Sequence, residues 1–347
     1  MTGTGPPPPA LRWSDDGPAV VLLDQTRLPA EEAELVCSDV GALVAAIARL
    51  AVRGAPLLGI AGAYGVALAA HRGDDVDAAA AALAGARPTA VNLAWGVRKA
   101  HDAWRAGGAA AALDEARSVE RADAAAADAI ARHGLALVPE RARVLTHCNT
   151  GRLVSGGCGT AFGIVAAAHR AGRLAQLWVD ETRPLLQGAR LTAYEAARAG
   201  MPYRVLADTA AASLFAARQV DLVVVGADRI AADGSVANKV GTLGLAVLAH
   251  HHGVPFVVAA PLSTVDPGTA SGADIVVEER APDEVTTFAG VPVAPKGAPA
   301  YNPAFDVTPP ELVTAVVTEA GIARPVDGSR LDELLRRSWQ SAREMSP

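Results

Sequence analysis

Leu222-Val223-Val224-Val225-Gly226-Ala227-Asp228 is a continuous apolar run that ends in a glycine and a carboxylate. An apolar run of this length is typical of a strand that is buried on both faces. Helical patterns separate most of the similar runs that occur after residue 141. This alternation predicts a parallel sheet with helices on both faces. The similar runs are residues 144–145, 177–179, 203–206, 256–258 and 275–277.

Polar motifs stand where most of these predicted strands end. Ligands of parallel sheets bind beyond the carboxyl ends of the strands, so the common placement of the motifs predicts a binding site there. The motifs are Thr146-His147-Cys148-Asn149, Asp180-Glu181-Thr182-Arg183, Asp208-Thr209, Gly226-Ala227-Asp228-Arg229 and Pro261-Leu262-Ser263.

The sequence divides into three parts. Residues 1–10 are rich in Pro and Gly and are predicted to form a disordered tail, not a signal peptide. Residues 11–140 are predicted to be an N-terminal domain of short strands, at 19–23 and 34–36, followed by helices, the first with Asp39 as its cap. The uncharged stretch 54–70 fits a buried helix better than a membrane span. Residues 141–347 are predicted to form the parallel-sheet domain with a C-terminal helix.

Composition excludes several classes of protein. Of the 347 residues, 51% are hydrophobic and 20% charged, as expected for a globular chain. The net charge is −6 and there is no basic block, which argues against binding along nucleic acid. Three cysteines fit neither a zinc site nor a disulfide framework, and predict reduced thiols in a cytoplasmic protein. His250-His251-His252 is interpreted as a solvated helix end, and no dinucleotide fingerprint or Walker loop occurs.

Cys148 and Asp228 are the candidate catalytic residues. Cys148 lies between a strand and the glycine-rich run at 156–160, a setting that favours a reactive thiol; a buried structural thiol is the alternative. Asp228 directly follows a buried strand, where partial desolvation raises a carboxyl pKa and suits a general acid. The alternatives for Asp228 are a helix cap or an ion pair with Arg229.

Several motifs could hold an anion or sugar hydroxyls. Arg53-Gly54-Ala55 can combine a guanidinium with backbone amides, although an Arg at a helix end is also ordinary capping. Asn238-Lys239 leads into a predicted helix start at Gly241-Thr242; an exposed lysine is the alternative. The amides of the glycine-rich run are suited to phosphate. Arg87 precedes a helix start, and Gln187 offers a neutral amide.

Together these motifs resemble the methylthioribose-1-phosphate isomerase family, which belongs with ribose-1,5-bisphosphate isomerase and the regulatory subunits of initiation factor eIF2B. The resemblance runs from about Leu22 to Ile322, and the ordered series of motifs is far more specific than any one of them. It rests on residues 51–56, 87–93, 146–151, 180–192, 226–231, 237–242 and 301–309.

The resemblance implies an α/β fold, with a smaller, mainly helical N-terminal domain joined to a Rossmann-like parallel sheet, usually as a homodimer. It implies a small sugar-phosphate substrate and no metal or organic cofactor. By this resemblance, Cys148 and Asp228 match the two catalytic positions. The substrate-binding positions are matched by Arg53, Gly54, Ala55, Arg87, Gln187, Asn238 and Lys239.

The implied reaction belongs to methionine salvage and converts 5-methylthioribose 1-phosphate into 5-methylthioribulose 1-phosphate. Asp228 would protonate the ring oxygen and Cys148 would assist hydrogen transfer from C2 to C1. Arg152 departs from the small residue usual in the family and could serve a second anion, which keeps ribose 1,5-bisphosphate as an alternative substrate beside 5-deoxyribose 1-phosphate. A non-catalytic regulatory module is a further alternative, but such subunits generally lack the Cys/Asp pair.

Overall fold

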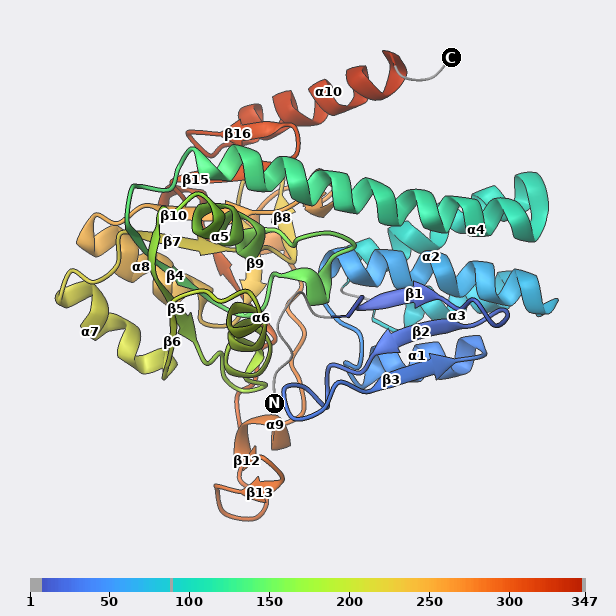
Figure 1. Cartoon of the computed structure of the whole chain (residues 1–347), viewed down its shortest axis with the longest axis horizontal. Helices are drawn as coiled ribbons and strands as arrows, with labels where there is room; N and C mark the ends of the chain where they lie inside the picture. The colour runs from blue at the N-terminus through green and yellow to red at the C-terminus, as the bar shows by residue number, and fades with distance from the viewer. Residues whose placement is uncertain (1–7, 88–89, 345–347) are drawn as a thin grey trace.

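The computed structural model describes residues 8–87 and 90–344, and a large sheet with helices on both faces forms one side of the molecule (Figure 1). The strand order of this sheet is β16-β15-β10-β7-β4-β5-β6, and every neighbouring pair is parallel except β15 with β16. The predicted parallel sheet is therefore confirmed. Its strands are β4 (Ala142–Thr146), β5 (Leu174–Asp180), β6 (Tyr203–Leu206), β7 (Leu222–Val225), β10 (Phe256–Ala259), β15 (Ala315–Thr318) and β16 (Gly321–Ala323).

Alternate side chains of the central strands enter two different cores. Val223 and Val225 pack with α7 (Ala211–Ala216), α8 (Thr242–His252) and α10 (Gly328–Glu344) on one face. Leu222 and Val224 pack on the other face with α5 (Ala161–Arg170), α6 (Ala193–Arg198) and the end of α4 (Val91–Leu135). Burial on both faces explains why these strands read as continuous apolar runs.

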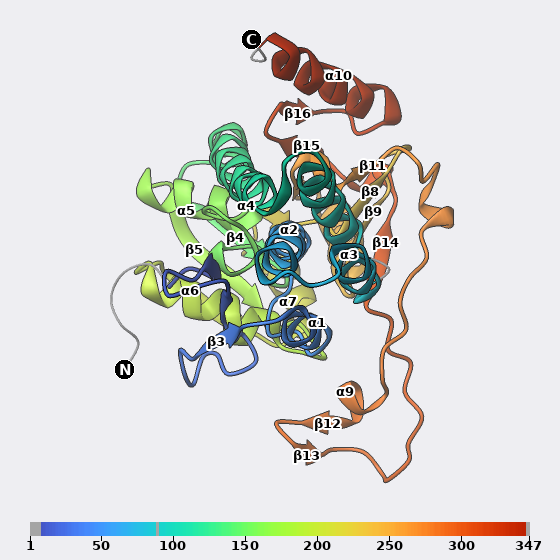
Figure 2. The same ribbon diagram turned by 90° about the vertical axis from the view of Figure 1, so that its right-hand side faces the viewer.

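One predicted strand is wrong. Residues 275–277 form no strand, and Val276 is 77% exposed. This segment leads into an arm that projects from the body and contains α9 (Asp283–Thr286), β12 (Thr287–Phe288) and β13 (Val291–Pro292) (Figure 2). The strand next to β10 is instead β15, with β16 at the edge beyond it, and neither of these two strands was predicted.

The N-terminal part is a three-stranded antiparallel sheet packed on helices. Its elements are β1 (Leu11–Trp13), β2 (Val20–Leu23), β3 (Glu34–Cys37), α1 (Val40–Ala48), α2 (Ala55–Arg72) and α3 (Val76–Gly85). The carboxylate of Asp39 accepts a hydrogen bond from the Ala42 amide, so the predicted cap of α1 is confirmed. Ala10 is already buried, while the first seven residues of the predicted tail lie outside the described residues. The domain boundary at residue 140 remains a prediction.

Two helices connect the N-terminal part with the large sheet. Most of α2 is buried, as predicted, and none of the helices in the described part of the chain combines the length and apolar character of a membrane span. α4 is interrupted at Gly107 and Gly108, and its second half returns to pack against α5 and β15. Because α2 packs along α4, the N-terminus of α2 is held next to the loops at the ends of β4 and β7.

A small second sheet completes the site. Its order is β11-β8-β9-β14, with strands β8 (Arg229–Ala231), β9 (Val236–Lys239), β11 (Val265–Asp266) and β14 (Phe305–Thr308). β8 and β9 are antiparallel neighbours directly after β7. This arrangement returns Asn238 and Lys239 toward Asp228.

Candidate active site

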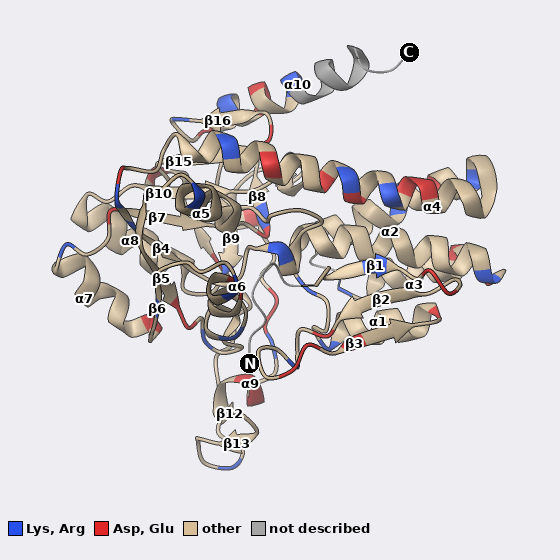
Figure 3. Cartoon of the chain, viewed as in Figure 1, with Lys and Arg blue, Asp and Glu red and all other residues tan. Residues whose placement is uncertain are grey.

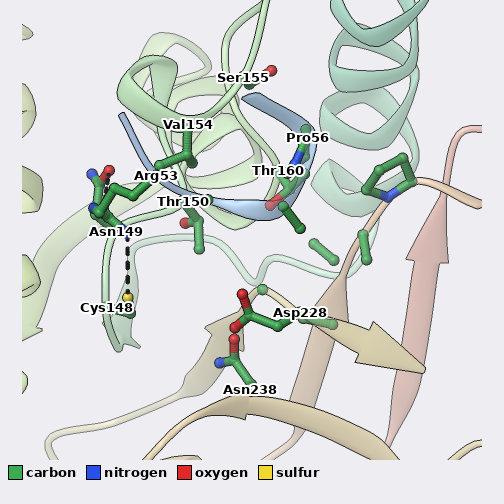
Figure 4. Close-up of a pocket in the computed structure, with 17 residues that line it drawn as sticks. Arg53, Pro56, Cys148, Asn149, Thr150, Val154, Ser155, Thr160, Asp228 and Asn238 are labelled. Carbon is green, nitrogen blue, oxygen red and sulfur yellow. Dashed lines mark hydrogen bonds between the residues drawn. The ribbon is translucent and has the colours of Figure 1, made fainter. Parts of the chain in front are cut away.

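A cavity of about 40 Å³ lies where β4, β7 and β10 end, and α2 begins in its wall. Figure 4 shows Cys148, Asn149, Asp228 and Asn238 around it, with Arg53 reaching in from the N-terminal part. The predicted meeting of strand-end motifs is thus present in the structure. Among the sequence-predicted residues, the cavity is lined by Arg53, Gly54, Ala55, Cys148, Asp228 and Asn238.

Cys148 has a backbone conformation that side chains rarely adopt, with φ of 63°. Such left-handed backbone costs about 1–2 kcal/mol for a residue with a Cβ, and it persists only where the surroundings impose it. Two hydroxyl groups do so here. The Thr182 hydroxyl accepts from the Cys148 amide at 2.9 Å, and the Thr192 hydroxyl donates to the Cys148 carbonyl at 2.6 Å.

A buried chain of polar groups orients Arg53. One Arg53 nitrogen donates to the Asn149 side-chain oxygen at 2.8 Å, and another lies 3.9 Å from the Cys148 sulfur. The Asn149 amide donates in turn to a Glu195 carboxylate oxygen at 2.6 Å, and the Arg152 backbone amide donates to the other at 2.7 Å. Burial raises the pKa of Glu195 to about 7, against the effect of these donors. The sequence analysis missed Glu195; a lone carboxylate on an Ala-rich helix was the only signal.

Asp228 lies at the end of β7, and burial raises the pKa of its carboxyl group, as predicted. The charges of Lys239, Arg87 and Arg53 oppose this rise without cancelling it. Arg229, the proposed ion-pair alternative, lies 3.3 Å from the carboxylate of Asp266. A carboxyl group with a raised pKa is better suited to donate a proton, so the arrangement supports Asp228 as a candidate acid.

Lys239 is buried, so its interpretation as an exposed lysine is wrong. Its ammonium group donates to the Ala304 carbonyl at 2.8 Å and lies 5.0 Å from the centre of the Phe305 ring. Burial lowers the Lys239 pKa, and the nearby Cys148 and Asp228 oppose this change. Asn238 precedes it in β9, and its amide donates to the Thr242 hydroxyl at 2.9 Å.

Arg87 and Gln187 lie outside this cavity. Arg87 is in a salt bridge with Glu278 at 3.5 Å, yet is near enough for its charge to affect Asp228. Gln187 is 3% exposed, and its side-chain oxygen has no hydrogen-bond partner within the described residues. It lines a second cavity of about 450 Å³, which Arg53 also lines. The Arg53 side chain therefore stands between the two cavities.

The glycine-rich run does not present all its amides to the cavity. The Gly156 amide donates to the Asp123 carboxylate and the Gly157 amide to the Ser155 hydroxyl. A Cβ at Gly157 would lie 2.8 Å from the backbone of Ala124 in α4, so this glycine serves close packing. The prediction that these two amides bind an anion is wrong, because protein groups already use them.

The remaining polar candidates are also accounted for. The pKa values of Cys37 and Cys158 are raised to about 11, chiefly by burial, which leaves both thiols protonated at neutral pH. His250-His251-His252 is exposed, as predicted. His147 lies beside Asp180 and Asp208, but its ring nitrogens are at 3.0 Å from Asp180 and 2.9 Å from the Val240 carbonyl. Since both nitrogens have partners, His147 ties the Cys148 loop to the segment after Lys239.

Comparison with known proteins points to one family. Residues 51–325 match the model of the initiation factor 2 subunit family. A methylthioribose-1-phosphate isomerase from Anaeromyxobacter dehalogenans is 55% identical over 93% of this chain and 96% of its own length. One of the same name from Pelotomaculum thermopropionicum is 49% identical over 94% and 93%.

Two solved structures share the fold over nearly the whole chain. The 5-methylthioribose 1-phosphate isomerase of Pyrococcus horikoshii has a TM-score of 0.88 and 38% identity, covering 95% of this chain and 96% of its own. A protein of A. fulgidus named as the delta subunit of translation initiation factor eIF-2B has a TM-score of 0.82 and 39% identity, with coverage of 94% and 99%. Proteins with this fold are therefore named either as isomerases or as subunits of an initiation factor. The residues of the candidate site must distinguish between these two functions.

Proposed function

Because the chain belongs to the initiation factor 2 subunit family, and within it to the methylthioribose-1-phosphate isomerases, we propose that it is an enzyme that converts 5-methylthioribose 1-phosphate into 5-methylthioribulose 1-phosphate. The observation that carries the proposal is the shared cavity of Cys148 and Asp228. A purely regulatory subunit has no need of a buried carboxyl group with a raised pKa facing a thiol.

The reaction is an isomerisation, so its atoms balance within the substrate. The ring oxygen gains a proton as its bond to C1 breaks, hydrogen moves from C2 to C1, and the C2 hydroxyl loses a proton to become the carbonyl. Asp228 supplies the proton to the ring oxygen, a role that its raised pKa supports. Cys148 assists at C2, and Arg53 lies near enough to its sulfur to stabilise negative charge there. Hydrogen transfer as a proton and transfer by a direct hydride shift both give this product.

The phosphate group is held by Arg53 together with the start of α2. The N-terminus of α2, which follows Gly54, has no side-chain cap, so the first backbone amides of the helix remain available to an anion. Lys239 contributes a buried amino group near Cys148 and Asp228. Arg87 adds charge from outside the cavity of Cys148 and Asp228, Asn238 offers its side-chain oxygen, and Gln187 has an unsatisfied oxygen for a sugar hydroxyl.

Substrate binding requires a rearrangement. A cavity of about 40 Å³ holds a water molecule, whereas ligand sites commonly span about 300–1,000 Å³. The second cavity is large enough, and Arg53 separates it from Cys148. A shift of the Arg53 side chain would join the two and bring Gln187 into the same site.

Ribose 1,5-bisphosphate is less well supported as a substrate. It needs a second anion group in the same site, and Arg152 was the candidate. The Arg152 side chain is exposed and lines other hollows, but not the cavity of Cys148 and Asp228. We propose further that the protein is cytoplasmic, as its unpaired thiols suggest, and that it forms a homodimer, as the family resemblance implies. Sedimentation of the purified chain tests the oligomeric state.

The decisive experiment compares kcat/KM for the purified protein with 5-methylthioribose 1-phosphate, 5-deoxyribose 1-phosphate and ribose 1,5-bisphosphate. We expect the methylthio sugar to rank first. Cys148→Ser and Asp228→Asn should each lower kcat by at least about 100-fold, because each removes a group that exchanges a proton in the reaction. Cys37→Ser is the matched thiol control and should retain full turnover if folded. Wild-type turnover in either catalytic variant would refute the assignment.

A further inference from the structure

A third cavity, of about 300 Å³, lies behind the Cys148 loop between α5 and α6. Phe162 and Met201 give it an apolar floor. Its rim carries Arg152, Arg170, Arg198 and His169, and Figure 3 shows the basic colour on α5. Its size lies at the lower end of the range for small-molecule sites. None of the residues assigned to the sugar-phosphate site lines it.

The charges of this cavity are only partly balanced by carboxylates. Among the described residues, neither the Arg152 nor the Arg170 guanidinium takes part in a salt bridge, whereas Arg198 pairs with Glu32. Glu195 is the one acidic residue among those lining the cavity in the described chain, and it is 2% exposed. Two guanidinium groups that form no salt bridge within the described residues, around a concave apolar floor, are suited to a small molecule with a phosphate group.

The cavity shares a wall with the active site. The short helix η1 (Arg152–Val154) presents Val154 to the cavity of Cys148 and Asp228, and Arg152 to the third cavity. Glu195 lines the third cavity and holds both the Arg152 amide and the Asn149 side chain, which in turn holds Arg53. An anion that moves Arg152 or changes the charge around Glu195 therefore acts on the hydrogen bonds that orient Arg53.

We propose that this third cavity is a second, non-catalytic binding site for a small phosphate-bearing metabolite, coupled to the active site through Glu195. The binding claim is independent of the isomerase proposal, and only the coupling to turnover rests on it. Coupling between two sites is reciprocal, so a ligand in one site must change affinity at the other by the same factor in both directions.

The test counts bound phosphate by equilibrium dialysis with labelled inorganic phosphate. Wild-type protein should bind two ions per chain, one in each site. Arg170→Ala should weaken one of them about tenfold, as expected for the loss of one charge-assisted hydrogen bond. Arg53→Ala should weaken the other. Arg132→Ala is the matched control, because it is also an exposed arginine in the last turn of a helix, and should leave both sites intact.

A second variant fills the cavity without removing charge. Ala199→Trp should abolish the same ion that Arg170→Ala weakens, and circular dichroism with thermal melting confirms that each variant is folded. The inference would be overturned if each chain bound one ion and only Arg53→Ala removed it. It would also be overturned if each chain bound two ions and neither Arg170→Ala nor Ala199→Trp affected them. Two bound ions without turnover on any sugar phosphate would refute the isomerase proposal and leave the second site standing.

Discussion

At the scale of single residues, Arg53 links more parts of the candidate site than Cys148 or Asp228 does. Its guanidinium contacts the Cys148 sulfur and the Asn149 side chain at once and separates two cavities. Only a planar fork can make both contacts. We therefore expect Arg53→Lys to lower kcat/KM by at least about tenfold, which steady-state kinetics can measure. Arg72→Lys, at an exposed arginine, is the control, and equal kinetics in the two variants would contradict this role.

The two candidate catalytic residues could be picked out from the sequence, whereas the residues that support them could not. Cys148 and Asp228 each follow an apolar run, and such a run places the next polar residue at a sheet end. Glu195 enters the site only through the packing of α6 behind the Cys148 loop, which no local pattern reveals. The error at Gly156 has the same cause, because its amide donates to Asp123, 33 residues earlier in the chain. The Gly157 amide donates to the neighbouring Ser155 hydroxyl, a local contact that was not predicted.

At the scale of elements, the close contact of α2 with α4 sets the position of the α2 N-terminus. A Cβ at Gly96 would lie 1.9 Å from the carbonyl oxygen of Gly59, so only glycine allows this distance. We expect Gly96→Ala to lower the free energy of unfolding by about 3 kcal/mol, as measured by urea denaturation. Gly85→Ala is the control: a Cβ there meets nothing within 4 Å, and stability should change by less than about 1 kcal/mol.

The elements themselves were predictable where a short β-branched run stands between helical patterns. β7, which is buried throughout, and β6, a partly exposed strand at the edge of the sheet, were both predicted to the residue. The run at 275–277 has the same composition, yet its neighbours form a projecting arm and its apolar side chain at Val276 stays exposed. The pairing of β9 with β14 joins residues 236–239 to residues 305–308, and a contact over that separation leaves no local signal.

At the scale of the whole molecule, Glu195 should make stability depend on pH. Its pKa of about 7 lies above the ordinary 4.5, so the folded protein keeps a proton that the unfolded chain loses. This contribution is complete below about pH 4.5 and is lost as the pH rises through about 7, a change of about 3 kcal/mol. Urea unfolding of wild type and Glu195→Gln at several pH values measures it. The variant should lack this part of the slope, and identical slopes would contradict the prediction.

The left-handed backbone at Cys148 has an evolutionary consequence. Glycine would adopt φ of 63° without strain, so Cys148→Gly should raise stability by up to about 1–2 kcal/mol while removing the thiol. If turnover depends on the Cys148 thiol, as proposed, selection for turnover would keep a cysteine where the backbone conformation favours glycine. In a lineage released from that selection, mutations to Gly or Asn at this position should accumulate early. The residue found at this position in a relative should then indicate whether that relative is still a catalyst.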